Sequence, residues 1–318
     1  MLRTSRIESF YTDLLQGRTP AGALDARPLA ARTVGHVHRL VVQALSVAER
    51  DGEVQRNAAR KAKRPMIERK EIEILDETQA RDVLRLLKPH VLMYRIAALG
   101  LATGMRRGEI CALRWKVVDL KGASLRVEQS LEQTKKGLRF KTPKTRYGVR
   151  MISLPASIVA ELRTLRREQQ ELRLKLGLGR EPDDTLVFRR FDPETGEISP
   201  LLPNSVTTEW WRLVKRLSLP KVSLHAWRHT HASQLIDSGM DVLTISRRLG
   251  HGSPSITLDV YGHRFKRKDE GAAAVFEAAF SQVFTETNVD ETDTITEEIS
   301  GKSVATPALL RQPDALSI

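Results

Sequence analysis

Six side chains that could together bind and attack a phosphate group lie in five short segments of the chain. They are Arg106, Lys144, His225, Arg228, His251 and Tyr261. Arginine carries a permanently charged planar fork that can contact two phosphate oxygens at once. Histidine moves protons near neutral pH, and a tyrosine hydroxyl can act as a nucleophile. Groups of these types could break a phosphodiester bond if the fold brings them together.

The two arginines and His225 would form the phosphate-binding part of such a site. Arg106 and Arg228 would neutralise charge on the non-bridging oxygens, and loss of one such donor typically costs about 3 kcal/mol of transition-state stabilisation. His225 precedes Arg228 by one helical turn, so both could face the same side of a helix. His229 and His231 follow closely, and we expect them to pack or cap rather than to react.

Other catalytic signatures are absent from the sequence. It contains no Walker P-loop, no GxGxxG after a predicted strand, no HExxH and no GxSxG motif. His225 and His229 have the i,i+4 spacing of some zinc ligands, but no glutamate follows the first histidine and no cysteine is near. The sequence therefore favours chemistry that uses no metal ion and no other cofactor.

The segments that carry these residues resemble the tyrosine recombinase, or phage integrase, family. The block LGLATGMRRGEICALRWKVVDL (99–120) is similar to the family's first motif. The block SLHAWRHTHASQLIDSGMDVLTISRRLGHGSPSITLDVYGH (223–263) is similar to its second motif, nearly without gaps. The resemblance covers about residues 90–265, and six separate positions agree in identity, order and approximate spacing.

The resemblance implies a site-specific DNA recombinase that cleaves and rejoins strands through a 3′-phosphotyrosyl intermediate, in integration or excision of a mobile element. Tyr261 would be the nucleophile. Because the covalent link preserves the bond energy, a 5′-hydroxyl could reseal the strand without ATP. Arg106, rather than the adjacent Arg107, fits the family pattern, in which Gly and Glu follow at two and three positions. Glu109 would then brace the turn or that arginine.

The resemblance also assigns Lys144, on a turn between strands, as the general acid for the departing 5′-oxygen. Lys141 and Lys135 compete for this role, because both lie near the same turn. His251 and His225 would contact phosphate oxygens and help to move protons.

The implied partner is double-stranded DNA. The family pattern predicts a monomer or weak oligomer when free and a tetramer on DNA, and it leaves open whether accessory DNA-bending proteins take part. Two other functional classes remain open. One is a catalytically degenerate, sequence-specific DNA-binding protein, against which the complete set of site residues argues. The other is a topoisomerase-like nicking enzyme, which would relax supercoils without a cognate site.

The sequence predicts a mainly α fold with a small antiparallel β-sheet around these segments. Apolar spacing predicts one helix over residues 7–15 and a second helix that begins after an N-cap at Thr33. A third helix is predicted from Asp76 to Leu87, because Asp76 and Gln79 have the order of a capping box. Further helices are expected over 90–101, 108–113, 156–176, 203–217, 223–238, 241–249 and 255–261. Alternating residues over 125–127, 138–140 and 149–154 predict one three-stranded sheet, with a turn at 144–148.

Four regions follow from these elements and from the resemblance. Residues 1–66 would be a helical core-type DNA-binding domain, and residues 67–269 the tyrosine recombinase catalytic domain. The first region is short for the family's bundle, so a compact or a truncated copy remains open. The basic run 56–65 would be a solvated linker or lie along a phosphate backbone.

The end of the chain forms the other two regions. Residues 270–284 would be a C-terminal helix whose apolar face docks on its own domain or in trans on a neighbouring protomer. That face consists of Phe276, Phe280, Val283 and Phe284. Residues 285–318 would be a flexible acidic tail.

Charge and composition agree with a DNA-binding protein. The net charge is +13, made up of +21 over residues 1–268 and −8 over the rest, and such basic proteins often bind polyanions. The single cysteine excludes an internal disulfide framework and a cysteine-based zinc cluster. No run of eighteen apolar residues exists and the N-terminus lacks a secretory signal, so we expect no membrane association and a cytoplasmic location.

Overall fold

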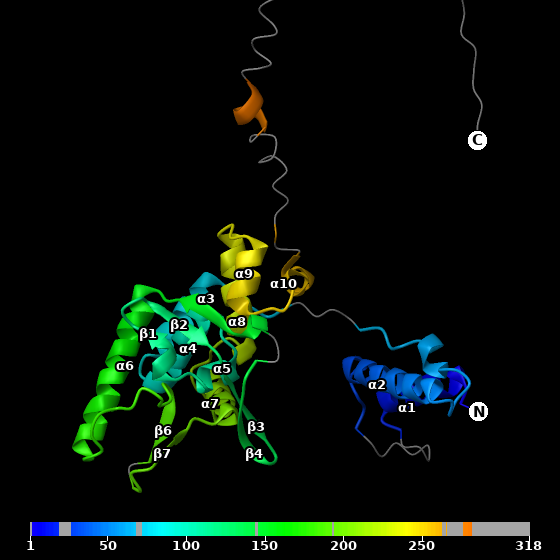
Figure 1. The fold of residues 1–318 in the computed structure, drawn as a ribbon, viewed down its shortest axis with the longest axis horizontal. Helices are drawn as coiled ribbons and strands as arrows, with labels where there is room; N and C mark the ends of the chain where they lie inside the picture. Colours follow the sequence, from blue (N-terminus) through cyan, green and yellow to red (C-terminus); the bar gives the residue numbers. More distant parts are fainter. Residues whose placement is uncertain are drawn as a thin grey trace, which may run out of the picture. The chain divides into compact units, whose positions relative to one another are not determined.

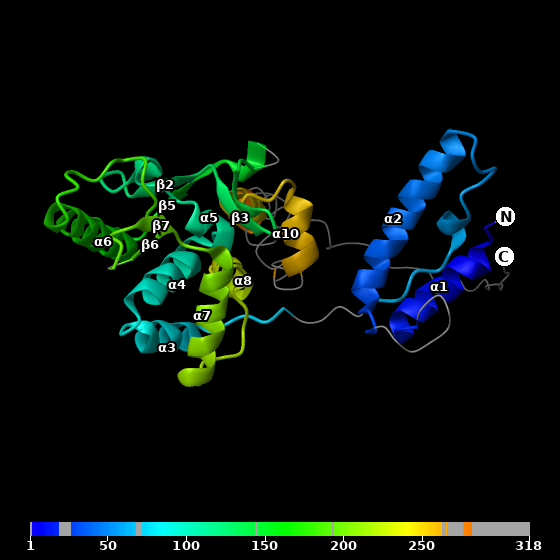
Figure 2. The same ribbon diagram turned by 90° about the horizontal axis from the view of Figure 1, so that it is seen from below.

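The chain folds into two compact units, residues 1–73 and 74–318, whereas the sequence placed the boundary between residues 66 and 67. The computed structural model describes residues 2–18, 27–67, 72–143, 146–192, 194–262, 265 and 276–281. Both units are mainly helical in Figures 1 and 2. None of the helices in these described ranges has the length and apolar content needed to span a bilayer.

The first unit packs two helices and a short 3-10 helix around a small core. These are α1 (Thr4–Gln16), α2 (Ala31–Arg50) and η1 (Ala58–Lys61). Gly17 adopts a left-handed φ of 71° and ends α1, which is a common glycine C-cap. The helix α2 begins two residues before Thr33, so the predicted cap at Thr33 is wrong, and Ala30 takes that position. Ile7, Tyr11 and Val34 form the centre of this core.

The basic run 56–65 folds back onto the first unit, so it is not a solvated linker throughout. Asn57 is buried, and its Nδ2 donates to the Val42 carbonyl at 2.9 Å and to Ser46 Oγ at 2.8 Å. Alanines alternate with the basic residues, and these alanines are buried in the core: Ala58, Ala59 and Ala62. The small apolar residues therefore anchor the run while its charged residues stay outside.

In the second unit, helices surround small antiparallel sheets (Figure 2). Its helices are α3 (Glu77–Leu87), α4 (Val91–Thr103), α5 (Arg107–Cys111), α6 (Ala156–Lys175), α7 (Pro203–Arg216), α8 (Leu224–Asp237), α9 (Val242–Leu249) and α10 (Pro254–Tyr261), with the 3-10 helices η2 (Trp115–Val117) and η3 (Arg146–Gly148). Asp76 caps α3 as predicted, because its Oδ1 accepts from Gln79 N at 2.8 Å and Gln79 Oε1 accepts from Asp76 N at 3.1 Å.

The core of this unit centres on α4, which is buried on nearly all sides and contacts α3, α6 and α8. The large side chains Trp115, Trp210 and Phe188 fill the space around it. Burial on all sides explains why the sequence of α4 is apolar without a polar face.

The predicted single sheet of 125–127, 138–140 and 149–154 is wrong in its middle strand. In the described residues, a three-stranded sheet has the order β1 (Val118–Asp119), β2 (Ser124–Val127) and β5 (Arg150–Ser153). Residues 138–140 instead belong to β4 (Gly137–Lys141), which pairs with β3 (Ser130–Thr134). A third pair joins β6 (Arg189–Phe191) to β7 (Ile198–Pro200).

Local turn geometry explains the separate β3–β4 hairpin. Gly137 has a φ of 117°, which lets the chain reverse directly after Thr134. Leu131 then lies opposite Phe140. Figure 1 shows the hairpin leading away from β1 and β2. The alternation over 138–140 thus reflected a strand exposed on both faces rather than a member of the core sheet.

Gly104 ends α4 at a point where two other helices pack closely. Its φ is 65°, and a Cβ there would lie 2.8 Å from side-chain atoms of both His231 on α8 and Leu249 on α9. The turn that leads to Arg106 therefore needs a residue without a side chain.

Gly104→Ala should destabilise the second unit more than Gly177→Ala. Both glycines have a left-handed φ, but a Cβ at Gly177 would meet nothing within 4 Å. The backbone cost of about 1–2 kcal/mol is common to both variants, and overpacking adds about 1–3 kcal/mol at Gly104 only. All four tryptophans lie within residues 115–227, so tryptophan fluorescence in urea follows this unit. Equal losses of unfolding free energy would contradict the packing argument.

Candidate active site

Arg106 stands immediately before α5 and is braced by a carboxylate of that helix. Its backbone N donates to Glu109 Oε2 at 2.9 Å, and its Nη1 donates to Glu109 Oε1 at 2.8 Å. The Arg106 side chain is 42% exposed, and it lines a cleft of about 660 Å³ together with His225 and Trp211. Glu109 braces both the turn and the arginine, as expected, and the guanidinium remains accessible from the cleft.

Arg228 lies on α8 and is buried. Its Nη1 donates to the Gly104 carbonyl at 2.8 Å and its Nη2 to the Leu249 carbonyl at 2.6 Å. Burial lowers the pKa of the Arg228 guanidinium, and the neighbouring charge of Arg106 lowers it further. Neutral carbonyls fix the position of this guanidinium without cancelling its charge. An anion bound beside it would therefore be stabilised electrostatically.

His225 and His229 lie on the same face of α8. Their ring centroids are 4.7 Å apart in an edge-to-face arrangement. Burial lowers the pKa of His225, and Arg228 and Arg106 add to the effect. Burial also lowers the pKa of His229, to about 4. Both rings are therefore neutral at pH 7, and their i,i+4 spacing serves mutual packing.

His251 follows the left-handed Gly250 that ends α9. Its Nδ1 is 2.8 Å from Thr257 Oγ1. Burial lowers the pKa of His251 to about 4, and the nearby charges of Arg228 and Arg106 contribute. The same two arginines thus act on both His225 and His251, which lie far apart in the sequence.

Tyr261 is the last residue of α10 and is 2% exposed. Its hydroxyl is 2.6 Å from His229 Nδ1. Burial raises the pKa of the Tyr261 phenol to about 12, although Arg228 acts in the opposite direction. The phenol is therefore protonated, shielded from water and held by an imidazole.

The structure brings Arg106, His225, Arg228, His251 and Tyr261 to one site. Lys144 lies outside the described residues, so the general-acid role stays a prediction. Of the competing lysines, Lys141 forms an ion pair with Glu132 and lines the same cleft, whereas Lys135 lies in the exposed turn of the β3–β4 hairpin.

Sequence reasoning missed two residues of this site. His229 was expected to pack or cap, yet it contacts the Tyr261 hydroxyl, and its i,i+4 relation to His225 was the signal available. Arg150 was not considered, although it is buried and donates to both oxygens of Glu109. His231 does pack: its Nδ1 donates to the Leu101 carbonyl at 2.8 Å.

In the part of the chain that the structure describes, no group of three or more His, Cys, Asp or Glu side chains is placed to hold a metal ion.

Comparison with known proteins assigns the chain to a family. The model of the phage integrase family matches residues 73–268. The chain belongs to the phage integrase family. It is 28% identical over 246 residues to the ICEBs1 integrase of Bacillus subtilis, covering 77% of this chain and 65% of that protein. It is 30% identical over 221 residues to a XerC-like tyrosine recombinase of Caldanaerobacter subterraneus, covering 66% of this chain and 55% of that protein.

Solved structures share the fold of this integrase-family chain at lower identity. The Tn1549 transposon integrase in complex with transposon right end DNA has a TM-score of 0.69 and 21% identity, covering 87% of this chain and 86% of that one. A lambda integrase tetramer bound to a Holliday junction has a TM-score of 0.52 and 16% identity, covering 80% of this chain and 65% of that one. The expected mainly helical recombinase fold is confirmed.

Lowering the pH from 7.5 to 5.0 should destabilise the second unit. Burial lowers the pKa values of His229, His231 and His251 to about 4, whereas unfolded histidine titrates near 6.5. Between these values the unfolded chain binds more protons, so stability present above about pH 6.5 is lost as the pH falls towards 4. Thermal unfolding followed by tryptophan fluorescence should show a lower midpoint at pH 5.0.

The variant His231→Gln separates this effect from carboxylate titration. Glutamine does not titrate, so the variant should lose part of the pH dependence between 7.5 and 5.0. Glu109 has a lowered pKa, and its contribution is lost only below about pH 4.5. A midpoint that is unchanged or higher at pH 5.0 would contradict the assignment.

Proposed function

We propose that this chain is a site-specific DNA recombinase that cleaves and rejoins strands through a covalent link to Tyr261. The observation that supports the proposal is that Arg106 and Arg228 lie close enough to act electrostatically on each other and on His225 and His251, and that Arg228 also acts on the Tyr261 phenol. The charge of +21 over residues 1–268 supports a polyanionic substrate. The chain spans 65% of the ICEBs1 integrase and 55% of the XerC-like tyrosine recombinase. The names of the ICEBs1 integrase and of the Tn1549 transposon integrase support a role in integration of a mobile element, and we propose excision as the reverse of the same reaction.

The proposed reaction balances without a metal ion or ATP. The Tyr261 oxygen attacks phosphorus as its proton passes to an imidazole of the site, and the bond from phosphorus to the 5′-oxygen breaks. Arg106 and Arg228 stabilise the charge that develops on the non-bridging oxygens. Lys144 supplies a proton to the departing 5′-oxygen, which leaves a 3′-phosphotyrosyl link. Attack by a 5′-hydroxyl on that link reverses the steps and joins the strand.

Duplex DNA would also change the state of the nucleophile. The Tyr261 phenol is buried against His229, and an approaching phosphate must replace or join this contact. The negative charge of the phosphate offsets the repulsion between Arg106 and Arg228, so binding and assembly of the site would be coupled. Such a step limits cleavage to the DNA-bound protein.

The proposed partner is double-stranded DNA in the cytoplasm. The lambda integrase neighbour was solved as a tetramer on a Holliday junction, and this supports a tetramer on DNA for the present chain. A monomer or weak oligomer is proposed for the free protein. Accessory DNA-bending proteins would be an additional requirement only if the purified chain fails to assemble on its sites.

A nicked DNA site should trap a covalent complex that depends on Tyr261. Sites can be selected from random duplexes with the Tyr261→Phe protein, which lacks the attacking oxygen and should retain binding. On a nicked version of the selected site, cleavage releases a short oligonucleotide that carries the 5′-hydroxyl. This oligonucleotide diffuses away, so the phosphotyrosyl link cannot be resealed. The unaltered protein should then form a denaturant-resistant adduct and Tyr261→Phe should form none, as judged by gel electrophoresis.

The same selected site discriminates the rival functions. Binding without any adduct would favour a catalytically degenerate DNA-binding protein. Relaxation of supercoiled plasmid that is equally fast with and without the site would favour a topoisomerase-like enzyme. Recombination between two plasmid-borne sites is the outcome expected here.

The C-terminal helix is a second element of the proposal. Residues 276–281 are helical, and Phe276 and Phe280 are 53% and 48% exposed with ring centroids 4.8 Å apart. The other expected members of the face, Val283 and Phe284, lie outside the described residues. We propose that this face docks in trans on a neighbouring protomer, because burial of a phenylalanine there would contribute about 1.5–3 kcal/mol.

Phe280→Asp should reduce four-protomer assembly while leaving binding to a single site unchanged. The new charge would have to be buried in the contact, which is costly. Ala278→Asp is the matched control, because it adds the same charge to the opposite face of the helix. Mobility-shift assays with one site and with paired sites measure both steps. Unchanged assembly of Phe280→Asp would refute docking in trans.

A further inference from the structure

Arg150 lies at the start of β5 with only 5% of its side chain exposed. Its Nη2 donates to Glu109 Oε2 at 2.8 Å and its Nη1 to Glu109 Oε1 at 3.2 Å. Its Nε donates to the Arg248 carbonyl at 2.7 Å, and Nη1 also reaches the Gly148 carbonyl at 3.3 Å. One guanidinium therefore connects β5 with the middle of α5, the end of α9 and the end of η3.

Two of these contacts reach segments that hold site residues. Glu109 is the carboxylate that also braces Arg106. The Arg248 carbonyl lies at the end of α9, three residues before His251. The chain between them packs directly on the guanidinium, because a Cβ at Gly250 would lie 3.0 Å from Arg150 Nη1. Arg150 thus contacts Glu109, which holds the predicted phosphate-binding Arg106, and the end of α9, which precedes the predicted site residue His251.

The electrostatics of Glu109 show what Arg150 supplies. The Glu109 side chain is 7% exposed, and burial alone would raise the pKa of its carboxyl. The hydrogen bonds and charge of Arg150 outweigh burial, with a smaller contribution from Arg106, so the pKa of Glu109 is lowered. Arg150 is the buried partner of this carboxylate, while Arg106 remains 42% exposed towards the cleft.

We propose that Arg150 is a positioning residue for the phosphate-binding site. It neutralises Glu109, so that Arg106 is oriented by the carboxylate and its charge stays available to a phosphate. It also fixes the end of α9 and so the approach to His251. This inference rests on the proposed recombinase function and adds to it a residue that does not contact the DNA strand being cleaved.

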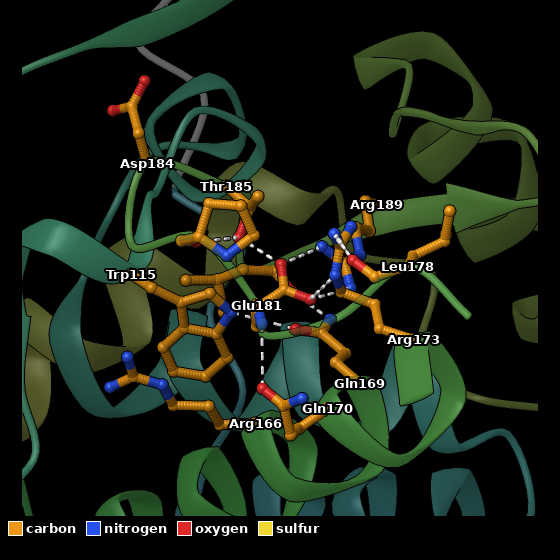
Figure 3. A network of polar contacts seen from close by, with 12 residues as sticks. Trp115, Arg166, Gln169, Gln170, Arg173, Leu178, Glu181, Asp184, Thr185 and Arg189 are labelled. Carbon is orange, nitrogen blue, oxygen red and sulfur yellow. Dashed lines mark hydrogen bonds and ion pairs between the residues drawn. The ribbon is translucent and has the colours of Figure 1, made fainter. Parts of the chain in front are cut away.

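A buried ion pair can instead serve stability alone, and the chain offers a matched control for that case. Arg189 on β6 forms a comparable two-bonded pair with Glu181, and their side chains are 5% and 2% exposed. Figure 3 shows this pair among Thr185, Gln170 and Arg173, and none of the residues labelled there is a predicted site residue. Arg189→Gln therefore removes the same kind of pair from the same unit.

The decisive measurement separates the rate of adduct formation from DNA binding. Rates are measured on the nicked site in single turnover with saturating protein, and dissociation constants are measured in the Tyr261→Phe background. Arg150→Gln should slow adduct formation by about 100-fold or more, with a dissociation constant within about threefold of the parent. Arg189→Gln should lower the unfolding midpoint by about as much as Arg150→Gln does. Its rate of adduct formation should stay within about threefold of the parent rate.

A second variant covers the case in which Arg150→Gln does not fold. Arg150→Lys keeps a positive charge beside Glu109, but one ammonium cannot reproduce the fork that contacts both carboxylate oxygens and the Arg248 carbonyl. It should fold and still lose about tenfold or more in rate. If Arg150 acts through Arg106, the double variant with Arg106→Lys should lose less than the product of the two single losses.

Three results would overturn the inference: folded Arg150 variants that react at the parent rate, an equal loss in Arg189→Gln, or losses that multiply in the double variant. Failure of the proposed function looks different. In that case the unaltered protein forms no Tyr261-dependent adduct, whereas failure of this inference leaves the adduct of the unaltered protein intact.

Discussion

Burying positive charge without fully cancelling it is the constraint on which the site in the second unit depends. Arg228 is held by carbonyls at Gly104 and Leu249, and Arg150 by the neighbouring carbonyl of Arg248. These carbonyls belong to the C-terminal ends of α4 and α9, where a helix carries partial negative charge. Helix ends therefore position the guanidinium groups, and among the described residues the carboxylate of Glu109 supplies the formal negative charge in contact with Arg106 and Arg150.

This arrangement determines the ionisation of the other groups. Burial and the nearby cations keep His225 and His251 neutral at pH 7, the form in which an imidazole can accept a proton. Burial keeps the Tyr261 phenol protonated, which suits the proposed nucleophile of a reaction that would begin only after DNA has bound. The site thus presents buried positive charge next to a protonated phenol.

Residue type and spacing were sufficient to predict most of the helices and to select candidate site residues, of which Arg106, His225, Arg228, His251 and Tyr261 lie near one another and Lys144 lies outside the described residues. Helix ends could be predicted because they depend on the backbone and capping preferences of single residues. Examples are Asp76, Gly104 and Gly250. The pairing of β4 was missed because strand order depends on contacts between distant segments, and the exposed alternation of β4 resembles that of a half-buried strand.

The role of Arg150 was hidden for a related reason. In β5 the alternation places Arg150 and Ile152 inside, while Met151 is 60% exposed. Hydrophobicity alone does not choose between the two faces, because Met151 and Ile152 are both apolar and lie on opposite faces. A buried arginine is acceptable only when it has carboxylate and carbonyl partners, and the sequence does not show these partners. His229 was missed similarly, since its contact with Tyr261 joins two helices that are separated along the chain.

The sharing of Glu109 between two arginines has an evolutionary consequence. Loss of Glu109 alone leaves Arg150 as an isolated buried cation, and loss of Arg150 alone leaves the acidic group to compete for Arg106. A protein with only one of the two residues replaced is therefore less stable than the parent. Simultaneous replacement of both residues by an uncharged pair of similar volume avoids this less stable single variant. Positions 109 and 150 should therefore drift together among descendants of this gene, even though forty residues separate them.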